Sequence, residues 1–207
     1  MVRPRRPESR APGRPGTRER LVRAAEELML RDGYSATRVD DVIRRAKLTK
    51  GSFYHFFDSK EALGLAALEH YYSDRAARLA SGRYAGEPDP RRRAQGFIDH
   101  AADVGEDLWK MGCLLASFAA DAAGSSPAIS RALRKRTDEL RAWVMEVLAP
   151  LATAEAGAAE LAEQFLVCVE GSIVLARIHG DPGYLRRAIT RFGRQLGKAA
   201  GARARRG

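Results

Sequence analysis

The stretch TKGSFYHFF, residues 49–57, contains four aromatic rings, a glycine and a lysine within nine residues. If the stretch is a helix, its three phenylalanines fall within one arc of about 100° and form the core of a small helical unit. Gly51 and His55 lie opposite that arc. A glycine on the exposed face of a helix costs about 1 kcal/mol relative to alanine, and close approach of a ligand is a usual reason for it. The predicted core rings are Phe53, Phe56 and Phe57.

The residues on either side predict a pair of short helices joined by a tight turn. The first of the pair is expected to begin at Thr37, where Thr37-x-x-Asp40 resembles a capping box, and Thr49 and Ser59 are expected to cap the next two helices. This geometry is typical of a recognition helix that enters the major groove of DNA. The helix N-termini at Thr37 and Thr49 would present free N–H groups to phosphates.

The exposed face of the second helix carries side chains that suit DNA. Lys50 is placed to reach a guanine edge, whereas Tyr54 and Lys60 are better placed for phosphates. A compact helical hairpin with a solvated basic face is the alternative, and DNA binding is favoured over it on the residues alone.

Residues 17–63, TRERLVRAAEELMLRDGYSATRVDDVIRRAKLTKGSFYHFFDSKEAL, resemble the DNA-binding head of the TetR family of bacterial transcription regulators. The apolar stripe, the GY helix stop, TKGSFYHFF and SKEAL all occur at matching spacing. One departure is Lys47, where family members commonly carry glycine; a left-handed residue there would cost about 1–2 kcal/mol. With Thr49 added for its helix N-terminus, the predicted DNA contacts are Thr37, Arg38, Thr49, Lys50, Gly51, Ser52, Tyr54, His55 and Lys60.

The net charge of +10 is unevenly distributed along the chain. Residues 1–60 carry +7, residues 61–182 carry −5, and residues 183–207 carry +8. Basic ends are the expected footprint of a polyanion such as nucleic acid, although basic tails also serve solubility. The arginine- and proline-rich start of the chain could enter the minor groove beside a bound head, or could be a bland tail.

The rest of the sequence predicts an all-α protein of about nine helices. A small N-terminal head of short helices precedes a larger helical body for ligand binding and dimerisation. No segment alternates with period two for long enough to indicate a strand. The predicted divisions are a disordered basic arm at 1–16, the DNA-binding head at 17–63, the body at 64–200 and a disordered basic tail at 201–207.

Residues 160–179 are apolar around nearly the whole helix, so this helix must be covered on more than one side. In proteins of the resembled family the last two helices form a four-helix dimer interface. A two-fold dimer implies a palindromic operator. The predicted interface residues are Phe165, Val169, Ile173, Leu185, Ile189, Phe192 and Leu196.

The resemblance also implies that the middle helices enclose a small-molecule inducer pocket whose occupancy changes the separation of the two heads. Each apolar candidate for the pocket wall could equally be plain core. The candidates are Trp109, Met111, Cys113, Leu114, Phe118, Trp143, Phe165 and Cys168.

Two polar features of the body suggest further chemistry. Cys113 lies near a helix start, where the helix dipole would lower its thiol pKa, so a thiol sensor is a hypothesis beside a buried hydrophobe. Glu170 lies inside an apolar run and is expected to meet a polar ligand group, to pair across the dimer, or to pair with Arg177.

An enzyme is disfavoured, because the four histidines are scattered and no zinc pair, phosphate loop or serine elbow occurs. No catalytic residue, metal site or cofactor is therefore predicted.

No apolar run approaches the length of about 18–20 residues that a membrane-spanning helix needs, and the chain is expected to be cytoplasmic. The sequence thus predicts a dimeric, ligand-responsive repressor. A non-specific architectural DNA-binding protein and an activator of the same family are the alternatives.

Overall fold

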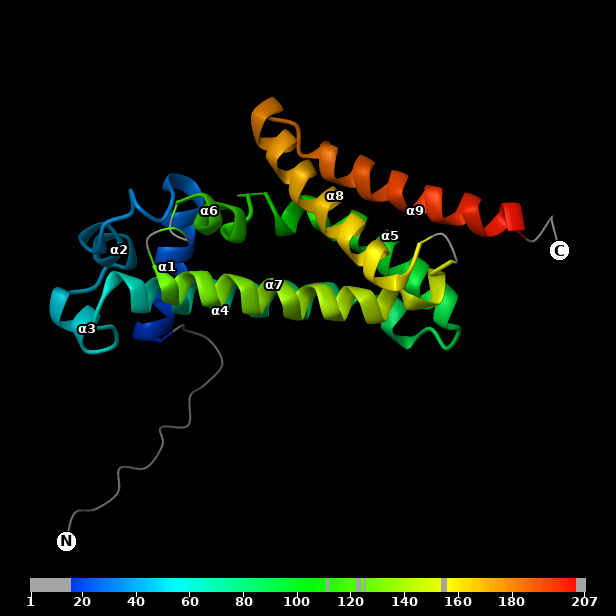
Figure 1. Ribbon diagram of the computed structural model, residues 1–207. Coiled ribbons are helices and arrows are strands. Elements are labelled where there is room, and N and C mark those ends of the chain that lie inside the picture. Colours follow the sequence, from blue (N-terminus) through cyan, green and yellow to red (C-terminus); the bar gives the residue numbers. More distant parts are fainter. Residues whose placement is uncertain (1–15, 111, 122–123, 125, 154–155, 204–207) are drawn as a thin grey trace, which may run out of the picture.

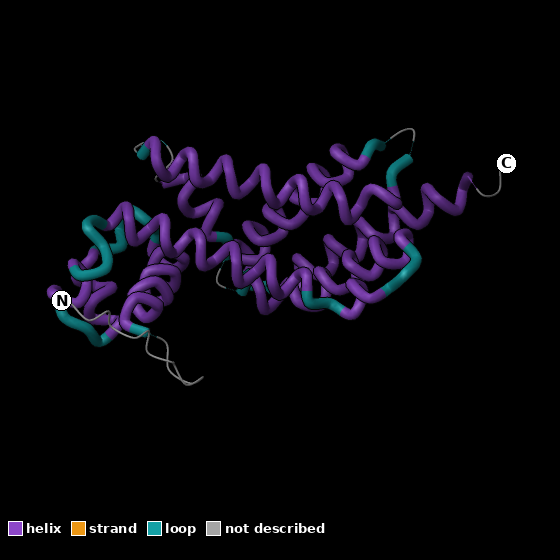
Figure 2. Tube along the Cα trace, turned by 90° about the horizontal axis from the view of Figure 1, so that it is seen from below, coloured by secondary structure: helices purple, strands orange, loops and turns teal. Residues whose placement is uncertain are grey.

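The computed structural model describes residues 16–110, 112–121, 124, 126–153 and 156–203. Within these ranges the chain is all-α and contains no strand (Figure 2). The α-helices are α1 (Thr17–Asp32), α2 (Val39–Ala46), α3 (Lys50–Tyr54), α4 (Lys60–Ala80), α5 (Pro90–Leu108), α6 (Leu114–Asp121), α7 (Pro127–Leu148), α8 (Ala158–His179) and α9 (Gly183–Arg203). Short 3₁₀ helices occupy Arg83–Gly86 and Ala149–Leu151. The predicted fold class is confirmed.

The helices form an elongated molecule with α1, α2 and α3 at one end (Figure 1). The long helices α4 and α7 run from that end into the body, where α8 and α9 form an antiparallel pair that packs on α5 and α7. Among the helices of the described residues, none is both long and apolar enough to cross a membrane.

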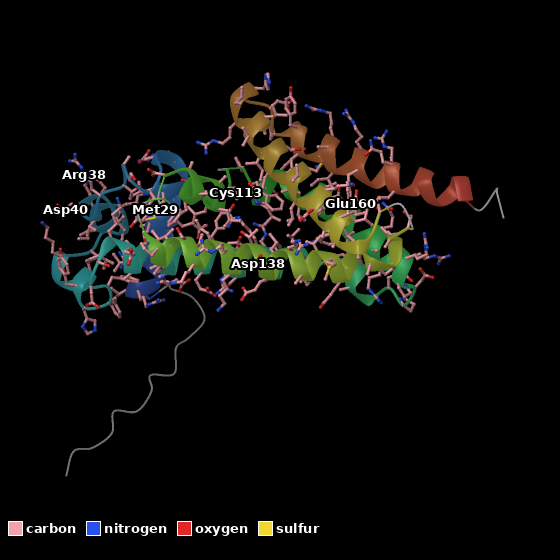
Figure 3. The ribbon with its side chains drawn as sticks, viewed as in Figure 1. Met29, Arg38, Asp40, Cys113, Asp138 and Glu160 are labelled. Atoms are coloured by element: carbon pink, nitrogen blue, oxygen red, sulfur yellow. The ribbon has the colours of Figure 1, made fainter. Side chains whose placement is uncertain are left out.

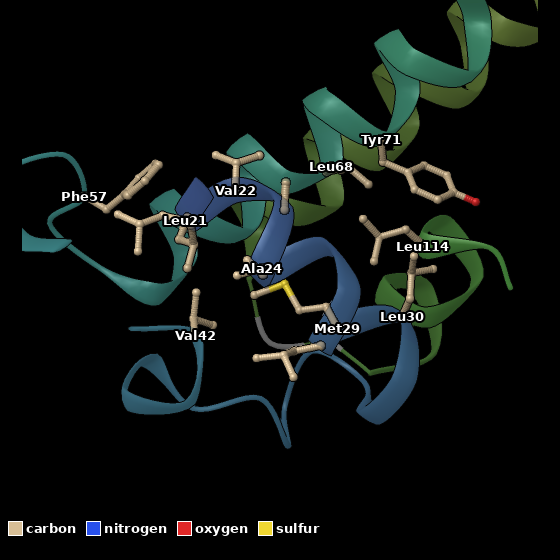
Figure 4. Packing of buried hydrophobic residues seen from close by; sticks show 14 of the residues in the cluster. Leu21, Val22, Ala24, Met29, Leu30, Val42, Phe57, Leu68, Tyr71 and Leu114 are labelled. Atoms are coloured by element: carbon tan, nitrogen blue, oxygen red, sulfur yellow. The ribbon is translucent and has the colours of Figure 1, made fainter. Parts of the chain in front are cut away.

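The core of the head is built from α1 and the phenylalanines of the aromatic stretch (Figure 4). Phe53 and Phe57 are buried, and their ring centroids lie 5.9 Å apart. The prediction was wrong for Phe56, whose side chain is 39% exposed. Because α3 ends at Tyr54, Phe56 lies in the turn that follows and does not keep the helical direction of the other two rings.

Two of the predicted helix caps are confirmed. The Thr49 hydroxyl accepts the N–H of Ser52 at 3.2 Å, and the Ser59 hydroxyl accepts the N–H of Ala62 at 3.0 Å. The prediction for Thr37 was wrong, because α2 begins only at Val39. The Thr37 hydroxyl instead donates to the carbonyl of Gly33 at 2.7 Å, so Thr37 stabilises the turn after α1.

The turn between α2 and α3 contains the one non-glycine residue with positive φ among the described residues. Lys47 is left-handed, with φ 54° and ψ 52°, and its neighbour Leu48 donates its N–H to the carbonyl of Ile43 at 3.1 Å. Arg20 of α1 donates to the carbonyls of Ala46 and Lys47 at 2.5 and 3.2 Å. The turn is thus held from α1 despite the cost of a left-handed side chain.

Helix α6 joins the head to the body. Phe118 packs against Tyr34 with ring centroids 4.9 Å apart, and the Ser117 hydroxyl donates to the carbonyl of Met29 at 3.1 Å. Leu114 and Phe118 are fully buried in the same cluster as the core of the head, which also takes in Ile129 and Leu133 of α7. A second apolar cluster fills the body between α5, α7, α8 and α9.

The last helix extends into the segment that was predicted to be a basic tail. Helix α9 continues to Arg203, three residues into the segment 201–207 that was expected to be disordered. The predicted N-terminal arm lies outside the described residues except for Gly16, whose carbonyl accepts the N–H of Arg20 at 2.8 Å at the start of α1.

Candidate functional site

The outer surface of the head carries basic side chains at the end of the molecule. Lys50, the first residue of α3, is exposed and its Nζ lies 3.1 Å from Oδ1 of Asp40 on α2. Arg38 is exposed at the start of α2, and Figure 3 shows Arg38 and Asp40 projecting from this end. Lys50 is therefore accessible to an anion, but an intramolecular carboxylate already competes for its charge.

Gly51 lies in the first turn of α3 and is exposed. A Cβ atom added there would find only one neighbour, the Thr49 Oγ1 atom at 3.9 Å, which is ordinary contact. The fold of the chain itself therefore gives no steric reason for glycine at this position. Close approach of an external surface to the backbone is a usual reason for glycine at such a position.

The remaining α3 side chains form a small exposed group. Tyr54 is 61% exposed and packs edge-on against Phe53, with ring centroids 5.1 Å apart. His55 is exposed and its ring lies edge-on to Phe56 at 4.7 Å. The Ser52 hydroxyl lies 3.0 Å from that of Thr49. These aromatic contacts restrict the rotamers of Tyr54 and His55 and so fix the shape of the surface that they present.

Two predicted contact residues have partners inside the chain. Thr37 is 2% exposed and its hydroxyl donates to the carbonyl of Gly33, so its side chain does not reach the surface. Lys60 donates to the carbonyl of Ser35 at 3.0 Å and lies 4.5 Å from the ring centroid of Tyr34. Burial lowers the pKa of Lys60, which is half-buried. Both residues shape the turn beside α2.

The body contains an apolar cavity between α4, α7 and α8, of about 50 Å³ measured as space open to the centre of a water molecule. Four of the predicted pocket residues line it: Trp109, Cys113, Trp143 and Phe165. Five aromatic side chains line the cavity among aliphatic ones, and α4 contributes Tyr71, Tyr72 and Arg75.

Three buried polar atoms of the cavity wall lack a hydrogen-bond partner among the described residues: Arg75 Nε, Glu170 Oε2 and Tyr72 Oη. The Thr137 hydroxyl near Tyr72 donates instead to the carbonyl of Leu133 at 2.9 Å. Buried polar groups are nearly always paired in folded proteins, so three unpaired atoms around one cavity make it the candidate site for a ligand with a polar group.

Cys113 does not have the activated thiol that its position near a helix start suggested. Burial raises its pKa to about 12, and the charge of Glu170 acts in the same direction. The thiol donates to Oε1 of Glu170 at 3.1 Å. Burial also raises the pKa of Glu170. Of the partners predicted for Glu170, Arg177 is wrong, because the recorded contact is with Cys113.

The other predicted pocket residues lie elsewhere. Leu114 and Phe118 are buried in the core of the head, and Cys168 is half-buried on α8 but does not line the cavity. Met111 lies outside the described residues. The sequence analysis missed Tyr71, Tyr72 and Arg75, because α4 was treated only as the helix that leaves the head. A tyrosine pair followed by an arginine one turn later was the available signal.

Two larger hollows open to solvent beside α8. One of about 540 Å³ lies between α1, α6 and α8, and one of about 310 Å³ lies between α5 and α8. None of the unpaired buried polar atoms in the described part of the chain lines either hollow. The smaller aromatic cavity is therefore the better candidate for a ligand site despite its size.

The outer face of α8 is apolar and exposed. Val167, Val174 and Ile178 are 72%, 49% and 69% exposed, and with Gly171 they fall on one face of the helix. Nothing lies within 4 Å of a Cβ atom added to Gly171. The opposite face of α8 holds three of the predicted dimer residues, and the other four lie on α9; all pack within the single chain. Phe165, Val169 and Ile173 on α8 and Leu185, Ile189 and Phe192 on α9 are buried, and Leu196 on α9 is partly buried.

Comparison with known proteins matches both parts of the chain to family descriptions. Residues 21–67 match the family described as "Bacterial regulatory proteins, tetR family". Residues 90–191 match "Transcriptional regulator LmrA/YxaF-like, C-terminal domain". The first match covers α2 and α3, and the second covers most of the body.

Curated relatives agree with these matches. The chain is 30% identical over 205 residues to the transcriptional regulator AcuR of Cereibacter sphaeroides, covering 93% of this chain and 91% of that protein. It is 35% identical to the HTH-type transcriptional repressor DhaR of Mycobacterium sp., covering 50% of this chain and 51% of DhaR. It is 40% identical to the HTH-type transcriptional repressor NemR of Escherichia coli, covering 37% of this chain and 39% of NemR. The aligned region thus spans about half of DhaR and less than half of NemR.

Solved structures share the fold. A regulatory protein TetR from Rhodobacter sphaeroides is 29% identical, with a TM-score of 0.72 and coverage of 86% of this chain and 97% of that one. A TetR transcriptional regulator from Chloroflexus aurantiacus is 27% identical, with a TM-score of 0.76 and coverage of 87% and 94%.

Proposed function

Because this chain belongs to the TetR family of bacterial transcription regulators, we propose that it is a ligand-responsive repressor that binds a palindromic operator as a dimer. A small-molecule inducer releases it from DNA. It acts by binding alone, in the cytoplasm. Two relatives, DhaR and NemR, are HTH-type transcriptional repressors, which supports repression over activation.

DNA contact is proposed for the exposed surface of the head. Helix α3 enters the major groove, where Lys50 reaches base edges and Tyr54 and His55 reach the backbone. Arg38, Thr49 and Ser52 contact phosphates at its border. Thr37 and Lys60 support this surface through their bonds to the turn after α1.

The observation that carries the proposal is the open space around Gly51. A methyl group there would meet no atom of the chain closer than 3.9 Å, so the missing side chain is explained by an external surface at van der Waals distance. A DNA groove edge that seats α3 supplies that surface.

Dimerisation is proposed through the outer face of α8. Val167, Gly171, Val174 and Ile178 provide an apolar strip with a small residue near its middle, which allows two helices to approach closely. The interface predicted from the sequence used residues of both α8 and α9, which pack inside the single chain, so the proposed interface keeps α8 but uses its exposed face. The second copy places the two heads on successive half-sites.

The experiment that tests this function measures fluorescence anisotropy on a duplex from the intergenic region beside the protein's own gene, with a scrambled duplex as control. We expect nanomolar binding that prefers the native duplex and weakens steeply with added salt, because lysine and arginine displace counterions from phosphates. Equal and weak binding to both duplexes would contradict a specific regulator and favour an architectural DNA-binding protein.

A further inference from the structure

The aromatic cavity of the body brings together three unpaired polar atoms from two helices. Arg75 and Tyr72 come from α4 and Glu170 comes from α8. The rest of the wall is apolar or aromatic. A buried donor or acceptor without a partner is costly, so the cavity is built for an occupant with a polar end and an apolar body.

The charge of that occupant follows from the charges and hydrogen-bond donors of the wall groups. The guanidinium of Arg75 keeps its charge at any physiological pH and its Nε–H can only donate. Burial raises the pKa of Glu170, which favours its neutral form and lessens its repulsion of a nearby anion. The Cys113 thiol already donates to Oε1 of Glu170. The cavity therefore favours an acceptor over a cation.

On the basis of the proposed ligand-responsive function, we propose that this cavity binds a small carboxylic acid as its anion, with the carboxylate on Arg75 Nε and the apolar body among Trp109, Trp143 and Phe165. The Tyr72 hydroxyl donates to the second carboxylate oxygen. One ordered water occupies about 10–15 Å³, and the cavity of about 50 Å³ is larger than that, so it has room for a small acid.

Arg75 also connects the cavity to the head. Its Nη1 atom lies 3.3 Å from Oε1 of Glu26 on α1, and Oε2 of Glu26 lies 2.7 Å from Nδ1 of His70. A ligand carboxylate at Nε competes with Glu26 for the charge of Arg75. Occupancy of the cavity thus weakens one of the contacts that hold α1, the first helix of the head, against α4.

The first test uses intrinsic fluorescence, since the chain has two tryptophans and both line the cavity. The full-length protein is titrated with benzoate and propionate, and with benzamide and benzylamine as neutral and cationic controls of similar shape. We expect at least one of the two acids to change the emission saturably and to bind about tenfold more tightly than either control. Equal or tighter binding of benzamide or benzylamine, or failure of both acids to bind, would overturn the proposal.

Variants separate recognition from folding. Arg75→Gln is expected to weaken binding of the acid about tenfold or more, whereas Arg78→Gln, an exposed arginine on the same helix, leaves it unchanged. Glu26→Gln is expected to strengthen acid binding, because it removes the competitor for Arg75. A general loss of structure cannot strengthen binding. Weaker acid binding in Glu26→Gln would therefore count against the competition between Glu26 and the ligand.

Operator binding by the same protein distinguishes the two proposals. Specific DNA binding without acid binding would refute the ligand class and leave the regulator in place. Acid binding that leaves operator affinity unchanged would refute the coupling through Glu26. Acid binding by a protein without operator preference would overturn the proposed function instead.

Discussion

Asp121, the last residue of α6, accepts a hydrogen bond from the backbone N–H of Ser35 at 2.5 Å. Ser35 lies in the turn between α1 and α2, and its carbonyl accepts a hydrogen bond from Lys60. The residue just before α6, Cys113, lines the aromatic cavity. A single two-turn helix therefore touches the proposed ligand site at one end and the base of the DNA-reading surface at the other.

Asp121→Asn is expected to weaken the response to ligand while leaving operator affinity nearly unchanged. The substitution keeps the side-chain size but loses the charge-assisted hydrogen bond to the N–H of Ser35. We expect the ligand-induced loss of operator affinity to fall about fivefold, at the lower end of typical allosteric couplings. Anisotropy titrations with and without a bound effector measure the change.

The same variant has a pH signature. The hydrogen bonds from Ser35 lower the pKa of Asp121 below its ordinary value. A lowered folded-state pKa contributes stability that is present above the unfolded-state pKa and is lost as the pH falls through the folded-state value. The wild type should therefore be more stable than Asp121→Asn in urea at neutral pH and should lose this advantage in acid below the ordinary carboxyl range. A difference in stability between the two proteins that persists at this acidic pH would contradict a stabilising role for the Asp121 carboxylate.

Gly51→Ala is expected to separate folding from DNA binding. The new methyl group meets no close atom, and alanine is favoured over glycine in a helix by about 1 kcal/mol, so thermal stability should be unchanged or higher. Operator affinity should fall about tenfold or more, because the methyl group pushes α3 away from the groove. Gly86→Ala, another position with open space around it, serves as the control and should leave operator affinity unchanged.

Asp40→Asn is expected to strengthen DNA binding. The carboxylate lies 3.1 Å from Nζ of Lys50 and competes with the operator for that charge. Its removal should raise affinity about threefold at low salt, with a smaller gain at high salt as surface charges are screened. Lys50→Ala should lower affinity, and the double variant should show no gain from Asp40→Asn. A gain that survives without Lys50 would point to simple repulsion between Asp40 and DNA.

Cys113 is expected to resist alkylation in the folded protein. With its pKa at about 12, about one thiol in ten thousand is ionised at pH 8, and the side chain is buried. Cys168 is half-buried and should react first with iodoacetamide. Peptide mapping by mass spectrometry gives the order, and both thiols should react readily in denaturant. Faster labelling of Cys113 would revive the thiol-sensor hypothesis.

Ile178→Arg is expected to convert the dimer to a monomer. The side chain is 69% exposed on the apolar face of α8, so the isolated chain should tolerate the charge while a symmetric interface would bury two arginines without partners. Light scattering after gel filtration measures the mass. Ala142→Arg, at an exposed position on α7, should leave the mass unchanged.

The sequence predicted the helices well because their boundaries depend on local signals. Thr49 and Ser59 cap the helices that follow them, as expected. The prediction that Thr37 starts α2 was wrong for a local reason as well, because its hydroxyl donates to the Gly33 carbonyl in the turn before α2. A side chain with two possible backbone partners cannot be assigned from spacing alone.

The cavity was harder to predict because its wall comes from helices that are far apart in the chain. Apolar periodicity predicts that Phe118 is buried but does not show which core it belongs to. In the structure it packs against Tyr34 of the head. In the same way, α8 is apolar on two faces and the sequence does not show which face belongs to the single chain. From the sequence alone Arg75 is expected to be a surface residue, and only the structure shows its ion pair with Glu26.

The core of the head has a consequence for the order in which the protein is made. Its apolar cluster is completed by Leu114 and Phe118 of α6 and by Ile129 and Leu133 of α7, which are synthesised about 60 to 80 residues after the end of α3. A nascent chain that ends after α4 exposes the apolar surface of α1 and α4 that these residues cover. Newly made heads therefore cannot acquire their final packing, or compete for operators, before the first half of the body has been synthesised.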